Sequence, residues 1–269
     1  MSLQGTLGFL GFGNMGRAIA GGLMECGAVG AKHLLVYDID EDKIAQAELM
    51  GLAVHKDPAA FSAACDYLVL AVKPQSMEEA LSQVKPGLTD RTLVISIAAG
   101  ISIAYIQERL GASFRVVRVM PNTPALVGAG AAGVALSATC KPTDGEVARL
   151  IFEAIGIVEM VPENLIDAVT AVSGSGPAYF FYLVECLVRA GVAEGLSEPQ
   201  ATRLASQTLI GAGLLLRDSA EAPGTLRERV TSKGGTTEAA LKTFAAEGFD
   251  KVVSAAVNAA SERSRALGR

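Results

Sequence analysis

The chain runs through Thr6-Leu7-Gly8-Phe9-Leu10 into Gly11-Phe12-Gly13-Asn14-Met15-Gly16, and this stretch decides the fold. Its apolar first part predicts a buried strand, and apolar residues at helical spacing over Asn14–Cys26 predict a helix after the glycines. In such a strand-loop-helix unit the first glycine makes the turn, the second lets a pyrophosphate approach the backbone, and the third allows close packing. We therefore expect Gly11, Phe12, Gly13, Asn14, Met15 and Gly16 to bind a dinucleotide cofactor.

A second expected strand, Leu34–Tyr37, ends at Asp38, about 20 residues after the glycines, as the dinucleotide pattern requires. A carboxylate at this place accepts hydrogen bonds from the ribose hydroxyls of NAD and repels the 2′-phosphate of NADP. We expect NAD(P)H as the cofactor, with NADH mildly favoured because of Asp38. The alternative is that Asp38 only caps the next helix, expected over Glu41–Met50.

Strand and helix patterns alternate as far as about Val161, whereas only helical patterns follow Glu163. This alternation predicts an N-terminal doubly wound α/β domain of Rossmann type, residues 1–162, and an all-α domain, residues 163–269. The expected strands are Thr6–Phe12, Leu34–Tyr37, Tyr67–Val72, Leu93–Ile97, Val116–Met120, Gly133–Ser137 and Ile157–Met160. The remaining expected helices are Gln75–Val84, Ile103–Leu110, Asp144–Ala154, Ala178–Leu196, Glu198–Leu216, Thr237–Glu247 and Asp250–Leu267.

Three strand ends in the first domain indicate where the rest of the cofactor would bind, because ligands of an open α/β sheet lie beyond the carboxyl ends of its strands. Their loops are small or stiffened by proline: Ala71-Val72-Lys73-Pro74, Ser96-Ile97-Ala98-Ala99-Gly100 and Met120-Pro121-Asn122-Thr123-Pro124. From them we predict cofactor contacts for Ala71, Val72, Lys73, Pro74, Ala98 and Asn122. The alternative for Lys73 is a solvated surface charge.

Two loops precede helices in the second domain. Ser173-Gly174-Ser175-Gly176-Pro177 places Ser175 where it could simply cap a helix. Ser232-Lys233-Gly234-Gly235-Thr236-Thr237-Glu238 exposes backbone N–H groups at a helix start, where an anion such as a carboxylate would bind, although a flexible loop is the plainer interpretation. The helix after the first loop is apolar nearly all round over Tyr179–Val184, which favours burial against a second subunit over the centre of a monomeric bundle.

Composition excludes several other classes. The 269 residues carry a net charge of -5, which leaves no basic surplus for nucleic acid. Two histidines and four scattered cysteines give no metal-binding pattern, so we expect no metal, and the cysteines are expected to be reduced core residues. No apolar run reaches about 18 residues, and Met1–Gly5 has no basic region, so we expect a cytoplasmic protein with no membrane association.

Taken in order, these motifs closely resemble pyrroline-5-carboxylate reductase over essentially the whole chain. The specific blocks are Met120-Pro121-Asn122-Thr123-Pro124-Ala125, Ser173-Gly174-Ser175-Gly176-Pro177-Ala178-Tyr179 and Gly234-Gly235-Thr236-Thr237. The resemblance implies an NAD(P)H-dependent oxidoreductase that transfers hydride to the cyclic C=N of 1-pyrroline-5-carboxylate and yields L-proline, the last step of proline biosynthesis. It also implies a helical domain that binds substrate and forms an intertwined homodimer, with larger rings of dimers in some members.

The resemblance further implies the roles of individual residues. Gly235, Thr236 and Thr237 would hold the substrate carboxylate, the Thr237 hydroxyl would approach the ring nitrogen, and Ser232 and Ser175 would support the pocket, so Thr237 and Ser232 are the catalytic candidates. Glu163 matches a position near the substrate, with a surface loop as the alternative. Lys233 and Arg229 depart from common family residues and add positive charge beside this turn.

Two other functions share part of this sequence pattern. A β-hydroxyacid dehydrogenase also joins a dinucleotide-binding domain to helices, but it carries a lysine and an asparagine one turn apart after its Gly-rich loop, and Tyr179–Val188 contains neither. A nucleotide sensor without catalysis would need no substrate pocket, so the intact Gly235-Thr236-Thr237 turn argues against it.

Overall fold

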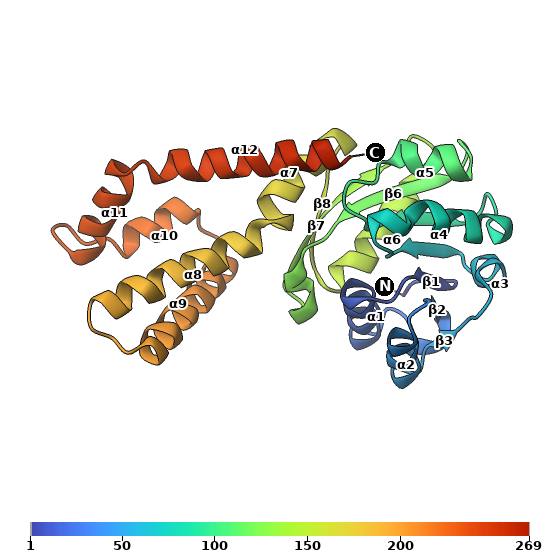
Figure 1. Cartoon of the computed structure of the whole chain (residues 1–269), viewed down its shortest axis with the longest axis horizontal. Helices are drawn as coiled ribbons and strands as arrows, with labels where there is room; N and C mark the ends of the chain where they lie inside the picture. Colours follow the sequence, from blue (N-terminus) through green and yellow to red (C-terminus); the bar gives the residue numbers. More distant parts are fainter. Residues whose placement is uncertain (1, 269) are drawn as a thin grey trace. The chain divides into compact units, whose positions relative to one another are not determined.

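One eight-stranded sheet organises the N-terminal part of the computed structural model, which describes residues 2–268 (Figure 1). The strand order is β3-β2-β1-β4-β5-β6-β7-β8. β1 therefore lies inside the sheet, and successive strands are added on one side of it up to β3 and on its other side from β4 onward. This is the predicted doubly wound arrangement. The strands are β1 (Leu7–Leu10), β2 (Leu34–Tyr37), β3 (Ala53–Val54), β4 (Tyr67–Leu70), β5 (Leu93–Ser96), β6 (Arg115–Met120), β7 (Gly130–Leu136) and β8 (Gly156–Met160).

The sheet departs from the expected parallel arrangement at its last two strands. β7 runs antiparallel to β6, and β8 is parallel to β7. A parallel pair needs a crossover of about a dozen residues or more, whereas β6 and β7 are joined by a short loop that contains only the 3-10 turn η4 (Thr123–Val127). The two prolines of this loop therefore mark a tight reversal rather than a crossover.

Helices cover both faces of the sheet and bury two apolar clusters (Figure 1). One cluster includes Phe9, Phe12 and Phe152 and involves α1 (Asn14–Glu25), α2 (Glu41–Leu49) and α6 (Pro142–Glu153). The other includes Phe61 and Met77 and involves α3 (Pro58–Ala63), α4 (Met77–Val84) and α5 (Ile103–Leu110). Since these helices bury one face each, the carboxyl ends of the strands stay free to form a site.

The chain divides into two compact units. The first comprises the residues up to Ser175 and those from Ala260 onward, and the second comprises Gly176–Ala259. The last helix begins in the second unit and ends in the first, where the Ser264 hydroxyl donates a hydrogen bond of 2.6 Å to Asp167 Oδ1. After the short helix α7 (Ile166–Val169) and the π-helix η6 (Thr170–Gly174), the helices are α8 (Gly176–Ala193), α9 (Glu198–Asp218), α10 (Pro223–Arg229), α11 (Thr236–Ala246) and α12 (Phe249–Leu267). The division between 162 and 163, which separates the domains by function, stays a prediction.

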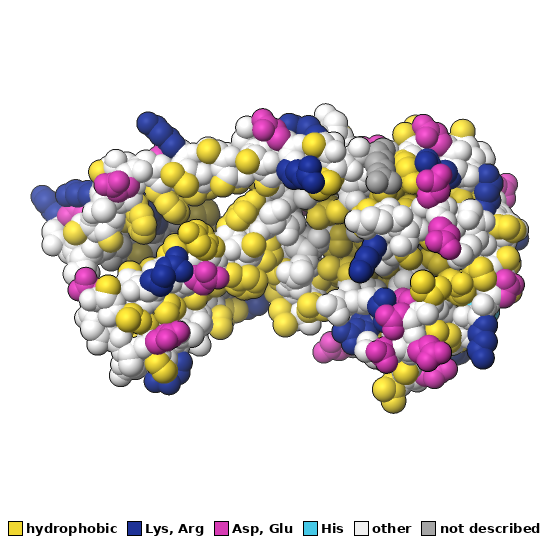
Figure 2. All heavy atoms as spheres, in the orientation of Figure 1, with side chains coloured by type: hydrophobic (Ala, Val, Ile, Leu, Met, Phe, Trp, Pro, Cys, Tyr) yellow, Lys and Arg dark blue, Asp and Glu magenta, His cyan; other side chains and the backbone are white. Residues whose placement is uncertain are grey.

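The helical unit exposes apolar side chains that a folded protein ordinarily buries. Phe180, Phe181 and Tyr182 of α8 are 55%, 61% and 63% exposed, and hydrophobic side chains are visible along its surface in Figure 2. Within Gly176–Ala259, a range that the structure describes in full, only Gly176 and Ala201 are buried. An exposed apolar surface of this kind marks an interaction site.

Several short elements escaped the sequence analysis: β3, α3, α7, η6 and α10. Each is too short to show a period of its own, since β3 has 2 residues, α3 has 6 and α10 has 7. The longer elements lie close to the expected ranges.

Candidate functional site

The glycine loop has the geometry that its sequence predicts. Gly11 has φ +91°, and a Cβ atom on it would lie 2.9 Å from the carbonyl carbon of Ala71. A Cβ on Gly16 would lie 3.2 Å from the Gly11 carbonyl oxygen, whereas a Cβ on Gly13 would meet nothing within 4 Å. The first and third glycines thus permit the turn and the close packing, and the second faces open space where a pyrophosphate can approach.

The start of α1 can receive the phosphates. Gly13 is its N-cap, and the Arg17 N–H donates to the Gly13 carbonyl at 3.0 Å. The N–H groups of Asn14, Met15 and Gly16 have no partner within residues 2–268. Free N–H groups at the positive end of a helix dipole bind anions, so the residues present fit a dinucleotide.

Asp38 closes this loop from the neighbouring strand. Its Oδ2 accepts the Phe12 N–H at 2.6 Å and its Oδ1 accepts the Asp40 N–H at 3.0 Å, with the side chain 6% exposed. The cap of α2 is Asp40, whose carboxylate accepts the Asp42 N–H at 3.1 Å. The alternative interpretation of Asp38 as the helix cap is therefore wrong, and its carboxylate lies at the glycine loop, where a ribose would bind.

The ends of β4 and β5 bring further predicted cofactor residues to the same sheet edge. The Ala71 N–H donates to the Leu10 carbonyl at 2.8 Å, which fixes Ala71 and Val72 beside Gly11. Lys73 is exposed, Pro74 begins a 3-10 turn, and Ala98 is buried after β5. The predicted cofactor residues Ala71, Val72 and Ala98 thus lie at the carboxyl ends of β4 and β5, the sheet edge that carries the glycine loop.

Asn122 lies at the end of β6, and its side-chain amide is engaged at both ends. Its Oδ1 accepts the Ala131 N–H at 2.8 Å, and its Nδ2 donates to the Ser173 carbonyl at 3.0 Å. Ser175 follows directly, with its N–H donating to the Thr170 carbonyl at 2.8 Å. The structure thus brings the end of β6 together with the turn that contains Ser175.

Glu163 lies in a 3-10 turn after β8 and is bound to two other elements. Its Oε1 accepts hydrogen bonds from Arg118 Nη1 at 3.1 Å and from the Ile103 N–H at 2.8 Å. The Arg118 side chain is 10% exposed, so its charge depends on this carboxylate. The sequence analysis missed Arg118, although a charged residue within an apolar strand is itself a signal that a partner is needed.

In the helical unit, the predicted carboxylate turn is tight. Gly234 has φ +73°, which favours glycine, and a Cβ on Gly235 would lie 2.4 Å from Ser232 Oγ, so a larger residue at 235 would displace the Ser232 side chain. The Glu238 carboxylate accepts the Gly234 N–H at 2.5 Å and pairs with Lys242 at 3.1 Å. These two contacts, the Gly234 N–H first, hold the pKa of Glu238 below its usual range.

The first turn of α11 presents free donors beside these glycines. The Gly235 N–H donates to the Ser232 carbonyl at 3.0 Å, and the Ala239 N–H donates to the Gly235 carbonyl at 3.2 Å. The N–H groups of Thr236, Thr237 and Glu238 have no partner among the described residues. This turn brings Ser232, Gly235, Thr236 and Thr237 together and can bind a carboxylate.

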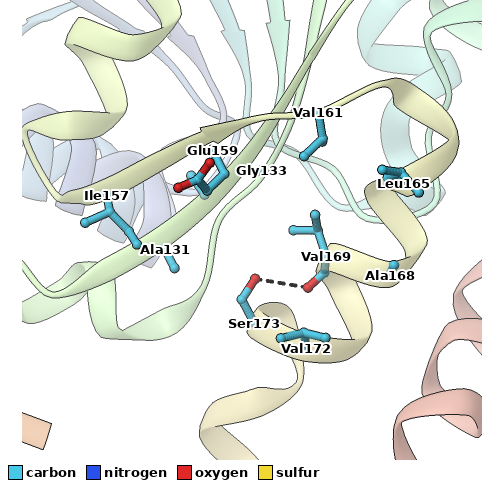
Figure 3. A pocket seen from close by; sticks show the side chains of 11 residues that line it. Ala131, Gly133, Ile157, Glu159, Val161, Leu165, Ala168, Val169, Val172 and Ser173 are labelled. Carbon is cyan, nitrogen blue, oxygen red and sulfur yellow. Dashed lines mark hydrogen bonds between the residues drawn. The ribbon is translucent and has the colours of Figure 1, made fainter. Parts of the chain in front are cut away.

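A separate hollow of about 410 Å³ lies between β7, β8 and the α7–η6 segment (Figure 3). Most of its lining is apolar, including Ile157, Val161 and Val172, and Glu159 is the one charged lining residue. It shares Ala131 and Ser173 with the Asn122 contacts and includes none of the predicted site residues.

Two of the four cysteines are held in their neutral thiol form by burial. Burial raises the pKa of the Cys65 thiol to about 12, and burial also raises the pKa of Cys140. Cys26 is exposed, which differs from the expectation of a core residue.

Comparisons with known proteins agree with the motifs. A family model described as pyrroline-5-carboxylate reductase dimerisation matches residues 163–267, and one described as NADP oxidoreductase, coenzyme F420-dependent, matches residues 6–100. The pyrroline-5-carboxylate reductase of Pseudomonas aeruginosa is 42% identical over 97% of this chain and 96% of that protein. A solved pyrroline-5-carboxylate reductase from Coxiella burnetii has a TM-score of 0.94 at 34% identity, covering 99% of this chain and 100% of that one. The pyrroline carboxylate reductase of Plasmodium falciparum, solved with NADP bound, has a TM-score of 0.86 at 33% identity and covers 100% of both chains.

A substitution of Glu163 tests whether its carboxylate stabilises the fold or binds the substrate. E163A leaves the Arg118 guanidinium and the Ile103 N–H without their acceptor, and we expect it to lower the free energy of unfolding by about 1–3 kcal/mol. E159A, the same change at an exposed position of β8, is the control and should have little effect. Chemical unfolding checks both; unchanged stability of E163A with a raised KM for the imino acid would instead make Glu163 a substrate ligand.

Proposed function

The chain belongs to the pyrroline-5-carboxylate reductase family, and we propose that its first unit binds the nucleotide while its helical unit supplies the groups that bind the imino acid. The reaction is the reduction of 1-pyrroline-5-carboxylate to L-proline. NAD(P)H supplies the hydride that adds to the carbon of the C=N bond, and the ring nitrogen takes up one proton. The observation that carries the first role is the loop of Gly11–Gly16 with free N–H groups at the start of α1.

The substrate carboxylate is assigned to the first turn of α11. Support comes from the unpaired N–H groups of Thr236, Thr237 and Glu238 and from the tight approach of Gly235 to Ser232. The hydroxyl of Thr237 then hydrogen-bonds the ring nitrogen, and Ser232 supports this turn. Ser175, at the start of α8, is assigned to the substrate as well. An imine can be protonated in water before it binds, so these residues need to orient the substrate rather than deliver its proton.

Asp38 is assigned to the adenosine ribose, with NADH mildly favoured over NADPH. Its carboxylate is held at the glycine loop by the Phe12 and Asp40 N–H groups, which leaves its charge directed at the ribose site. A 2′-phosphate would be repelled there, although Lys43, whose Nζ is 3.8 Å from Asp38 Oδ1, reduces that repulsion.

Self-association is assigned to the helical unit, in a protein that we place in the cytoplasm. The exposed apolar residues of α8 and α9 support this, as does the match of residues 163–267 to a dimerisation model. The helical run Glu163–Ala193 is also long and apolar enough to cross a membrane by composition alone. Burial against a second copy covers the same side chains without a membrane.

The direct test of the function is the initial rate of NADH and NADPH oxidation by the purified protein, with and without 1-pyrroline-5-carboxylate. We expect oxidation only when the imino acid is present, with L-proline as the product detected by chromatography. The assignment would be contradicted by a folded protein that binds a nucleotide but oxidises neither NADH nor NADPH when 1-pyrroline-5-carboxylate is present.

The role of Asp38 is tested by D38N, which keeps the shape of the side chain but removes its charge. We expect kcat/KM for NADH to fall by about tenfold or more, because a hydrogen bond to a charged group contributes about 1.5–3 kcal/mol, while NADPH is affected less. D57N, the same change at the N-cap of α3, is the control. An unchanged ratio of the two cofactors would limit Asp38 to holding the glycine loop.

The role of the Thr237 hydroxyl is tested by T237V, which keeps the volume of the side chain. We expect kcat/KM for the imino acid to fall by about 10- to 100-fold with unchanged nucleotide affinity, and T237S to retain most activity. T243V removes a hydroxyl that bonds only its own helix, at the Ala239 carbonyl, and serves as the matched control. Full turnover by T237V would remove Thr237 from the mechanism.

A further inference from the structure

A π-helical turn, η6 (Thr170–Gly174), separates α7 from α8 and leads directly into Ser175. Its defining hydrogen bond runs from the Ser175 N–H to the Thr170 carbonyl, five residues earlier, at 2.8 Å. Such turns are rare and occur frequently at functional sites, since they shift the side chains that follow relative to a regular helix. The position of Ser175 therefore depends on whatever holds this turn in place.

The turn leaves one backbone carbonyl without its regular helical partner. In an α-helix the Ser173 carbonyl would accept from the N–H of residue 177, but residue 177 is proline and has no N–H. The donor is instead Asn122 Nδ2, at 3.0 Å, from the end of β6. The Asn122 side chain thus joins the π-helical turn to the end of β6 by a hydrogen bond.

The other end of the same amide fixes its orientation. Because Asn122 Oδ1 accepts the Ala131 N–H at 2.8 Å, Nδ2 must face the Ser173 carbonyl. Aspartate could accept from Ala131 but could not donate to Ser173. The packing is close as well: a Cβ on Gly174 would lie 2.8 Å from Met120 Cε, and a Cβ on Gly133 would lie 2.6 Å from Val169 Cγ1.

We propose that Asn122 is a positioning residue for the reduction: its amide holds the π-helical turn, and with it Ser175, in register with the loop at the carboxyl end of β6. The inference rests on the proposed function, because that loop belongs to the proposed cofactor site and Ser175 to the proposed substrate site. It gives the Asn122 amide a role within the protein in addition to its predicted cofactor contact, because each end of that amide has a protein partner and still has one free N–H or lone pair.

The first test compares N122D with the wild-type protein. N122D keeps the acceptor for Ala131 and loses the donor to Ser173. We expect kcat to fall by about 10- to 100-fold, because small displacements of aligned groups lower the rate by such factors. The Kd for NADH, measured by fluorescence without substrate, should stay within about twofold because the glycine loop is untouched. N164D makes the same chemical change at an exposed residue of η5 and should leave both values unchanged.

A second test asks whether Asn122 positions the π-helical turn or only supplies a hydrogen-bond donor to the Ser173 carbonyl. N122A removes both contacts and should lower both Tm and kcat, whereas P177A supplies a backbone N–H to the Ser173 carbonyl from within the helix. In N122A/P177A we expect part of the Tm to return while kcat stays low, because the turn is still not tied to β6. P177A alone provides the reference for the double variant.

Three results would overturn the proposal. They are full turnover by N122D, a loss of NADH affinity in N122D that matches its loss of kcat, and recovery of kcat in N122A/P177A. A failure of the proposed function is a different result, since the wild-type protein itself would then not turn over 1-pyrroline-5-carboxylate.

Discussion

The hydrogen bond from the Phe12 N–H to Asp38 is the interaction on which the first unit's site depends. It joins the loop after β1 to the end of β2, and it holds a nearly buried carboxylate beside a helix start whose N–H groups are free. Gly11 can turn there because only a glycine fits against Ala71 at φ +91°. A pyrophosphate and a ribose bound as proposed would therefore meet partners that are ordered on folding rather than on binding.

The other end of the site follows from the demand that buried polar groups find partners. Arg118 stands in an apolar strand, so its guanidinium needs an acceptor. Pro177 stands four residues after Ser173, so the Ser173 carbonyl needs a donor from outside the helix. Glu163 meets the first at Arg118, and Asn122 meets the second at Ser173. Both contacts join segments that follow β8 to strand β6. Arg118 lies within β6 and Asn122 in the loop that follows it, so the strand and the start of this loop are both joined to the segment after β8.

Most of the architecture was predictable because its signals are local. The glycine loop, the apolar strands and the long helices each repeat a short-range pattern, and Asp38 stands at a fixed distance from Gly11. The direction of β7 was not predicted, since apolar periodicity indicates a strand but not whether it runs parallel or antiparallel to its neighbour. The partners of Asn122 and Glu163 lie 51 and 45 residues away along the chain, at Ser173 and Arg118, and no local pattern connects them. Sequence analysis therefore found these two residues as candidates but not what they touch.

The helical unit buries too few of its own residues to account for its stability by itself. With Gly176 and Ala201 as its only buried residues, Gly176–Ala259 cannot gain from its own contacts the apolar burial that ordinarily offsets the entropy of ordering a chain. Its long helices still expose phenylalanine, leucine and isoleucine side chains. A surface that is shared by two copies of one chain solves this with a single self-complementary interface. The Thr236–Glu238 turn belongs to this same unit, so an interface that covers these helices would also order the proposed carboxylate site.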